Sequence, residues 1–175
     1  KHESIRDYLV AYNIVKKLSE YGPSNRYVFN FVYPYDLNNF CKEIINEDSN
    51  LQNKCYDSII QLIDKADITA KTHFSYLLGR FENSTIREKA KVFLLKQKQK
   101  VFDQVKRVIP FDSTQKLSNE QKKILLYLRT IYISLTYLGD NKSSGEYIKQ
   151  LTSNRYFDNL NRGFHLEYYE DIVFD

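Results

Sequence analysis

The chain has 175 residues, of which 42% are hydrophobic and 27% are charged, and its formal net charge is +4. This length suits one domain, and this composition is typical of a globular protein rather than of a disordered one. No apolar run approaches the roughly 20 residues of a transmembrane helix, and the two cysteines are too few for a disulfide framework. No signal peptide opens the chain, so we expect a cytoplasmic protein with no membrane partner. Methionine is absent even at position 1, which predicts a piece of a longer protein.

The low glycine and proline content predicts an all-α protein. Only 5 Gly and 3 Pro occur in the chain, and apolar residues recur with the helical period over long stretches. Successive helices joined by short loops pack as antiparallel pairs. We therefore expect one domain over residues 1–175, either an irregular antiparallel helical bundle or a short α-solenoid, with about seven helices.

The first predicted helix runs from Ser4 to Tyr21 and is amphipathic. Ser4, with Asp7 three residues later, has the pattern of a capping box. Gly22 and Pro23 end the helix, because glycine favours the position after a helix and proline cannot continue it. The helical period places one apolar stripe along this segment: Ile5, Tyr8, Leu9, Tyr12, Val15 and Leu18.

The next segment, from Arg26 to Tyr35, is aromatic and β-branched. This composition favours a strand, but a lone strand is marginal among helices, so we expect a buried helical turn or an extended linker ending at Pro34. Asp36 then caps a short helix, and Asn50 opens another. The expected inner faces are Leu37, Phe40, Cys41, Ile44 and Ile45, then Cys55, Ile59, Leu62 and Ile63. Both cysteines fall on these faces, which predicts buried free thiols.

The fourth and fifth predicted helices follow closely. The fourth covers Ile68 to Phe81. Ser84 caps the fifth, which runs from Thr85 to about Val108 and is the longest of the set. Its inward residues are Ile86, Ala90, Phe93, Leu94, Val101 and Val105.

Two more helices complete the pattern. A capping box of Ser118 and Gln121 starts the sixth, which ends at Gly139. The seventh covers Ser144 to Thr152. The stretch from Arg155 onward is aromatic and acidic, and its period does not define an element.

Signatures of catalysis and of metal binding are missing from the sequence. No glycine is followed by lysine, so there is no Walker A phosphate loop. Arg6 stands where a zinc protease helix beginning at His2 would need its second histidine. His73, and His165 with Glu167, Glu170 and Asp171, leave a metal or acid–base site as a third alternative, but their spacing is unspecific and favours surface polar residues and aromatic packing. We therefore expect a non-enzymatic domain without metal or cofactor.

The positive charge is concentrated in the middle of the chain. Residues 85–130 carry 12 basic and 4 acidic side chains, whereas residues 1–84 and 131–175 have net charges of −1 and −3. Lys89, Lys96 and Lys100 share one side of the fifth predicted helix, and Lys91 and Lys98 lie on an adjacent side. The candidate phosphate-binding residues are Lys96, Lys98, Lys100, Lys122 and Lys123.

This basic region has two further interpretations. The preferred one is a solvated helix face or a face that meets an acidic surface elsewhere in the parent protein, and the second is a face that binds a protein ligand. Lysine outnumbers arginine, and few aromatic residues interleave with the basic positions, which argues against stacking on bases. Nucleic-acid binding is therefore the alternative to protein binding rather than the first expectation.

The first eleven residues, KHESIRDYLVA, resemble a segment of the NACHT-type STAND NTPases. In that family a pattern of His, Glu, Ser, an apolar residue, any residue, an acidic residue, Tyr and Leu follows the nucleotide-binding and winged-helix modules. The residues that fit this pattern are His2, Glu3, Ser4, Ile5, Asp7, Tyr8, Leu9 and Ala11. The resemblance covers only about the first dozen residues, and it is moderately specific.

This resemblance implies that the chain is the helical C-terminal region of a bacterial STAND ATPase, many of which act in antiphage defence. ATP is then bound by an upstream module of the same protein, from which residues 1–22 continue and on which their apolar positions pack. The helical region senses a trigger, such as a phage or host protein, or holds the ATPase in its resting state. Trigger binding favours an open ATPase, which then oligomerises.

A second, shorter resemblance lies near the end of the chain. Residues Asn161–Asp171 are similar to a segment near the end of some large bacterial NTPases of this kind, although Glu170 stands here where that segment has glycine. The candidate recognition residues are Arg162, His165, Tyr168 and Tyr169. The same composition also suits a terminal cap whose tyrosines cover the last helix pair.

Overall fold

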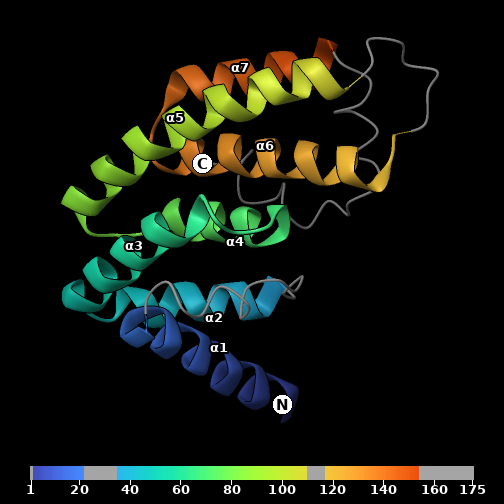
Figure 1. Cartoon of the computed structure of the whole chain (residues 1–175). Helices are drawn as coiled ribbons and strands as arrows, with labels where there is room; N and C mark the ends of the chain where they lie inside the picture. Colours follow the sequence, from blue (N-terminus) through green and yellow to red (C-terminus); the bar gives the residue numbers. More distant parts are fainter. Residues whose placement is uncertain (1, 22–34, 110–116, 154–175) are drawn as a thin grey trace.

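The computed structural model describes residues 2–21, 35–109 and 117–153, and these ranges form seven helices without a strand (Figure 1). The helices are α1 (His2–Tyr21), α2 (Tyr35–Asn46), α3 (Ser49–Ile63), α4 (Ile68–Leu78), α5 (Ser84–Val108), α6 (Asn119–Tyr137) and α7 (Asn141–Ser153). The all-α prediction is therefore confirmed. The expected turn or linker before Pro34, and the stretch from Arg155 onward, lie outside the described residues.

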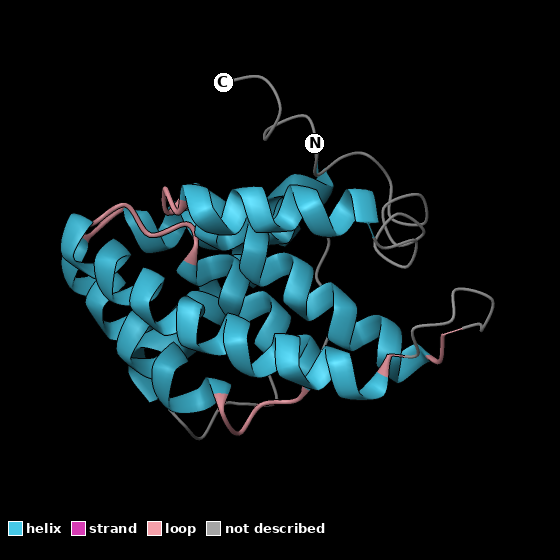
Figure 2. Cartoon of the chain, turned by 90° about the horizontal axis from the view of Figure 1, so that it is seen from above, coloured by secondary structure: helices cyan, strands magenta, loops and turns pink. Residues whose placement is uncertain are grey.

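The helices are stacked from α1 at one end to α5 and α7 at the other (Figure 1). α1 packs on α2 and α3, and α6 packs on α4, α5 and α7. α5 and α6 run in opposite directions (Figure 1). Seen from above, the described connections between the helices are short loops (Figure 2). None of the helices in the described ranges combines the length and apolarity needed to cross a membrane.

The buried residues form one cluster to which all seven helices contribute. The predicted inner faces of α2, α3 and α5 are buried, except that Phe40 and Phe93 are only partly covered. Cys41 and Cys55 are buried free thiols, as predicted. Burial raises the pKa of each thiol to about 12, so both remain protonated near neutral pH.

Side-chain caps set where the helices begin. The predicted capping box of α6 is present, since Ser118 accepts a hydrogen bond from the Gln121 amide and the Gln121 side chain accepts one from the Ser118 amide. α3 begins at Ser49 because the Asp48 carboxylate accepts from the Leu51 amide at 3.0 Å, so the expected start at Asn50 is one residue late.

Five other predicted boundaries are shifted. Asn83, not Ser84, caps α5, because its side-chain oxygen accepts from two amides of the first turn. Asp36 and Ser4 lie inside the first turns of α2 and α1 rather than at their caps. α4 ends at Leu78, three residues before Phe81. α7 begins at Asn141, three residues before Ser144, because Asp140 caps it.

A close approach between two helices joins α4 to α6. Gly79, at the end of α4, lies against Ser134, and a Cβ atom added to Gly79 would lie 2.6 Å from the Ser134 Cβ and 2.7 Å from its Cα. The Arg87 guanidinium connects the segment after α4 to the end of α6. It donates to the carbonyl of Phe81 at 3.2 Å and to the carbonyl of Tyr137 at 2.8 Å. The Tyr137 carbonyl ends α6, so a cation there also favours the helix dipole.

Candidate docking surfaces

α1 has one face in the core and a second apolar face outside it. The buried residues are Ala11, Ile14, Val15 and Leu18. Ile5, Tyr8, Leu9 and Tyr12 remain between 39% and 62% exposed. We call these four residues the α1 stripe. Their spacing of three, four and seven positions places them on one side of the helix. The single stripe expected from the sequence is therefore divided, because Val15 and Leu18 belong to the buried face.

The α1 stripe extends onto α2. The ring of Tyr8 meets the ring of Phe40 edge to face, with 5.7 Å between their centroids. Phe40 is itself only partly buried, so the two helices together present an apolar surface. Scattered exposed apolar residues are normal, but a contiguous set at helical spacing is typical of a surface that another protein element covers.

The residues that carry the STAND-type resemblance fall on both faces of α1. His2, Glu3 and Ser4 form its first turn, and Ala11 is in the core. Asp7 is half-buried and lies 3.4 Å from the exposed guanidinium of Arg6, an ion pair that contributes little to stability. The apolar members Ile5, Tyr8 and Leu9 face outward. Packing within the described fold accounts in part for Tyr8, through its contact with Phe40, but it does not explain why Ile5 and Leu9 are apolar.

The lysines of the basic region have different environments. Lys96 and Lys100 are exposed on α5, and no ion pair joins either to any described residue. Lys122 and Lys123 are exposed in the first turn of α6, where Lys123 pairs with Glu120 at 3.0 Å. These four lysines are available at the surface, although Lys123 already has a carboxylate neighbour.

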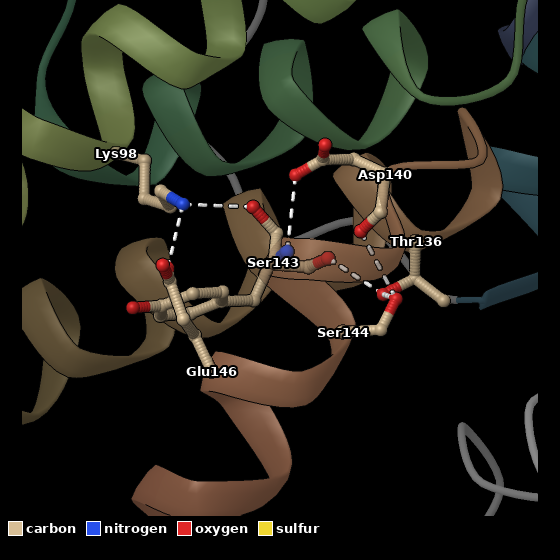
Figure 3. A network of polar contacts seen from close by, with 7 residues as sticks. Lys98, Thr136, Asp140, Ser143, Ser144 and Glu146 are labelled. Atoms are coloured by element: carbon tan, nitrogen blue, oxygen red, sulfur yellow. Dashed lines mark hydrogen bonds and ion pairs between the residues drawn. The ribbon is translucent and has the colours of Figure 1, made fainter.

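Lys98 is held within the fold (Figure 3). Its Nζ lies 2.7 Å from Glu146 Oε2 and donates to Ser143 Oγ at 2.8 Å, and its side chain is only 12% exposed. The ammonium also lies 5.6 Å from the centre of the Tyr132 ring, which stacks on Tyr147. Lys98 therefore joins α5 to α7 and does not belong to the exposed basic surface in which the sequence placed it.

Asp140 organises the start of α7 beside this ion pair. Its carboxylate accepts a hydrogen bond from the Ser143 amide at 3.1 Å, which is the geometry of an N-cap (Figure 3). Ser144 Oγ also lies 3.1 Å from Thr136 Oγ1 and ties α7 to α6. Burial alone would raise the pKa of Asp140, but the hydrogen bonds from Ser143 and the charges of Lys91 and Lys98 outweigh it and lower that pKa.

The described residues show no constellation for metal chemistry. No group of three or more His, Cys, Asp or Glu side chains within residues 2–21, 35–109 and 117–153 could hold a metal ion. His73 is buried in α4. The candidate recognition residues Arg162, His165, Tyr168 and Tyr169 lie outside the described part of the chain.

Sequence reasoning missed two features of these surfaces. The α1 stripe was not separated from the buried face, although Ala11 and Ile14 start a second apolar series with the same spacing. Asp140 was not recognised as a cap, although an aspartate directly after Gly139 is a good N-cap signal. No protein-family model, no curated protein and no solved structure matches this chain.

Proposed function

We propose that the chain is a non-enzymatic regulatory domain that docks through the α1 stripe onto an upstream nucleotide-binding module of the same protein, as in NACHT-type STAND NTPases. The observation that carries this proposal is the exposure of Ile5, Tyr8 and Leu9, which are apolar members of the resembling segment. Residues that are apolar, contiguous and outside their own core are expected to face a partner.

The energetics of such docking are adequate. Full burial of one large apolar side chain contributes about 1.5–3 kcal/mol. The four members of the stripe are already partly covered, so each contributes a fraction of that amount on docking. Because the upstream module is tethered to α1, its effective concentration is high, and a modest interface is sufficient to hold the two modules together.

In this mechanism the docked domain stabilises the resting state of the ATPase. A trigger, such as a phage or host protein in the bacterial cytoplasm, binds the helical domain better in the open arrangement and so shifts the equilibrium towards it. The opened ATPase then oligomerises. Any ATP hydrolysis belongs to the upstream module, and the helical domain itself carries binding rather than chemistry.

The reading frame that encodes this chain gives the first test. We expect it to encode a P-loop and a winged helix upstream of Lys1. If the complete reading frame lacks a nucleotide-binding module, the STAND assignment is wrong.

Charge substitution in the α1 stripe gives the second test. We expect Ile5→Glu with Leu9→Glu, made in the complete protein, to raise basal ATP hydrolysis and the oligomeric fraction severalfold, because carboxylates cannot be buried against an apolar partner. Ile148→Glu is the matched control, since Ile148 is 60% exposed on α7 at the other end of the stack (Figure 1). Circular dichroism of the 175-residue chain must show unchanged melting for both variants. Equal behaviour of the stripe variant and the control would contradict docking through α1.

A further inference from the structure

α5 lies at the opposite end of the stack from α1 (Figure 1) and carries a second exposed surface, which is basic. Lys89, Val92, Lys96 and Lys100 follow one another at spacings of three, four and four residues, so they lie on one side of the helix. All four are exposed, and Val92 is 53% exposed. We call this set the α5 lysine face. At 1.5 Å per residue, the three ammonium groups span roughly 16 Å of the helix.

The α5 lysine face carries three cations for which no counter-charge lies among the described residues. Lys98 is neutralised by Glu146 and Lys123 by Glu120, while Lys106 lies 4.4 Å from the centre of the Phe102 ring. Among the described residues, Lys89, Lys96 and Lys100 have no ion pair. The fold therefore engages Lys98, Lys106 and Lys123 and leaves the three lysines of this face available to a partner.

The composition of this side of α5 favours a protein over a nucleic acid. Val92 places an apolar side chain between Lys89 and Lys96. The exposed carboxylate of Asp103 lies one turn beyond Lys100 and accepts from Gln99 at 3.1 Å. A phosphate backbone is uniformly negative and would be repelled there, whereas an amphipathic protein helix can supply carboxylates for the lysines and an apolar residue for Val92.

We propose that the α5 lysine face binds an acidic amphipathic helix of another protein. The partner helix lies along α5, with one carboxylate near each of the three lysines and an apolar side chain over Val92. This surface is separate from the α1 stripe, so the inference goes beyond the proposed function and does not depend on an upstream NTPase module.

The test uses the 175-residue chain and labelled helical peptides of about 20 residues. One peptide carries glutamates at i, i+7 and i+11 with leucine at i+3, and a second carries the reversed order for the antiparallel arrangement. A scrambled peptide of the same composition is the control. We expect anisotropy to show binding of a patterned peptide at about 50 mM salt, and about tenfold weaker binding of the scrambled one.

Charge reversal locates the site. The variant Lys89→Glu/Lys96→Glu/Lys100→Glu is expected to lose at least about tenfold in affinity for the patterned peptide. The matched control is Lys54→Glu/Lys65→Glu/Lys142→Glu, which changes the net charge equally at three exposed lysines on other parts of the fold and should retain binding. Circular dichroism checks that both variants fold, and single Lys96→Glu replaces the triple variant if the latter unfolds.

Three results would overturn the inference. Absence of peptide binding at low salt would mean that the face is only solvated. Equal losses in both charge-reversed variants would mean that net charge, rather than this face, attracts the peptide. Tighter binding of a 20-base-pair DNA duplex than of the peptide, lost in the same α5 variant, would assign the face to nucleic acid. None of these results bears on docking through α1, so the two proposals fail independently.

Discussion

At the scale of single residues, the contact of Gly79 with Ser134 sets how closely α4 lies to α6. The atoms that a new Cβ would meet include the Ser134 Cα, which belongs to the backbone and cannot rotate away. Protein interiors are close-packed, so an additional methyl group at this contact fits only if a helix moves. The glycine is thus required by packing and not by backbone conformation, since its φ of −72° is open to any residue.

We therefore expect Gly79→Ala to lower the free energy of unfolding by about 1–3 kcal/mol. Gly145→Ala is the control, because Gly145 lies inside α7 with nothing within 4 Å of its added Cβ. Alanine there should stabilise the helix by about 0.5–1 kcal/mol. Urea denaturation measures both values. If the two alanine variants have the same midpoint, the contact of Gly79 with Ser134 does not limit how closely α4 packs on α6.

At the scale of elements, the sequence predicts each helix well and its first residue less well. The helical period and the low glycine content are averaged over many residues, so one atypical residue does not change the prediction of a helix. The first residue of a helix depends on which of several neighbouring polar residues caps it. Asp48 rather than Asn50 caps α3, Asn83 rather than Ser84 caps α5, and Asp140 rather than Ser144 caps α7. Each pair contains two residue types that are favoured as caps, so the sequence alone does not decide between them.

Asp140 makes the stability of α7 depend on pH. Its pKa in the folded chain is lowered below the usual value of 3.8, so the carboxylate stabilises the fold above that value and loses this effect as the pH falls through the lowered pKa. We expect Asp140→Ala to cost about 1 kcal/mol at pH 7 and clearly less near pH 2 to 3. Asp140→Asn should retain most of the cap but remove the pH dependence. Urea midpoints at both pH values test this, and a cost that is the same at both would show that the charge has no role.

At the scale of the whole molecule, the sequence predicts composition and periodicity but not which faces meet. The buried and exposed apolar series of α1 overlap, so only the position of α2 and α3 shows that Val15 is inside and Leu9 outside. Lys98 and Lys96 are alike in the sequence, yet the packing of α7 beside α5 brings Glu146 to Lys98 alone. Candidate surfaces therefore depend on tertiary neighbours that lie far apart in the chain.

The same tertiary contacts predict that the stack unfolds as one unit. Buried residues from α1 to α7 form a single cluster, and α6 links α4 to both α5 and α7. Unfolding of the helices at one end of the stack therefore exposes apolar surface on the helices next to them.

The chain contains no tryptophan, so a single introduced indole reports its own surroundings when excited selectively. Phe40→Trp places one in α2 and Phe93→Trp places one in α5, both at half-buried positions. We expect their urea transitions to coincide with each other and with the loss of helical circular dichroism. A transition of Phe40→Trp at lower urea, with the circular dichroism of α4 to α7 retained, would contradict this. It would show two folding units, of which the one that carries the α1 stripe is the less stable.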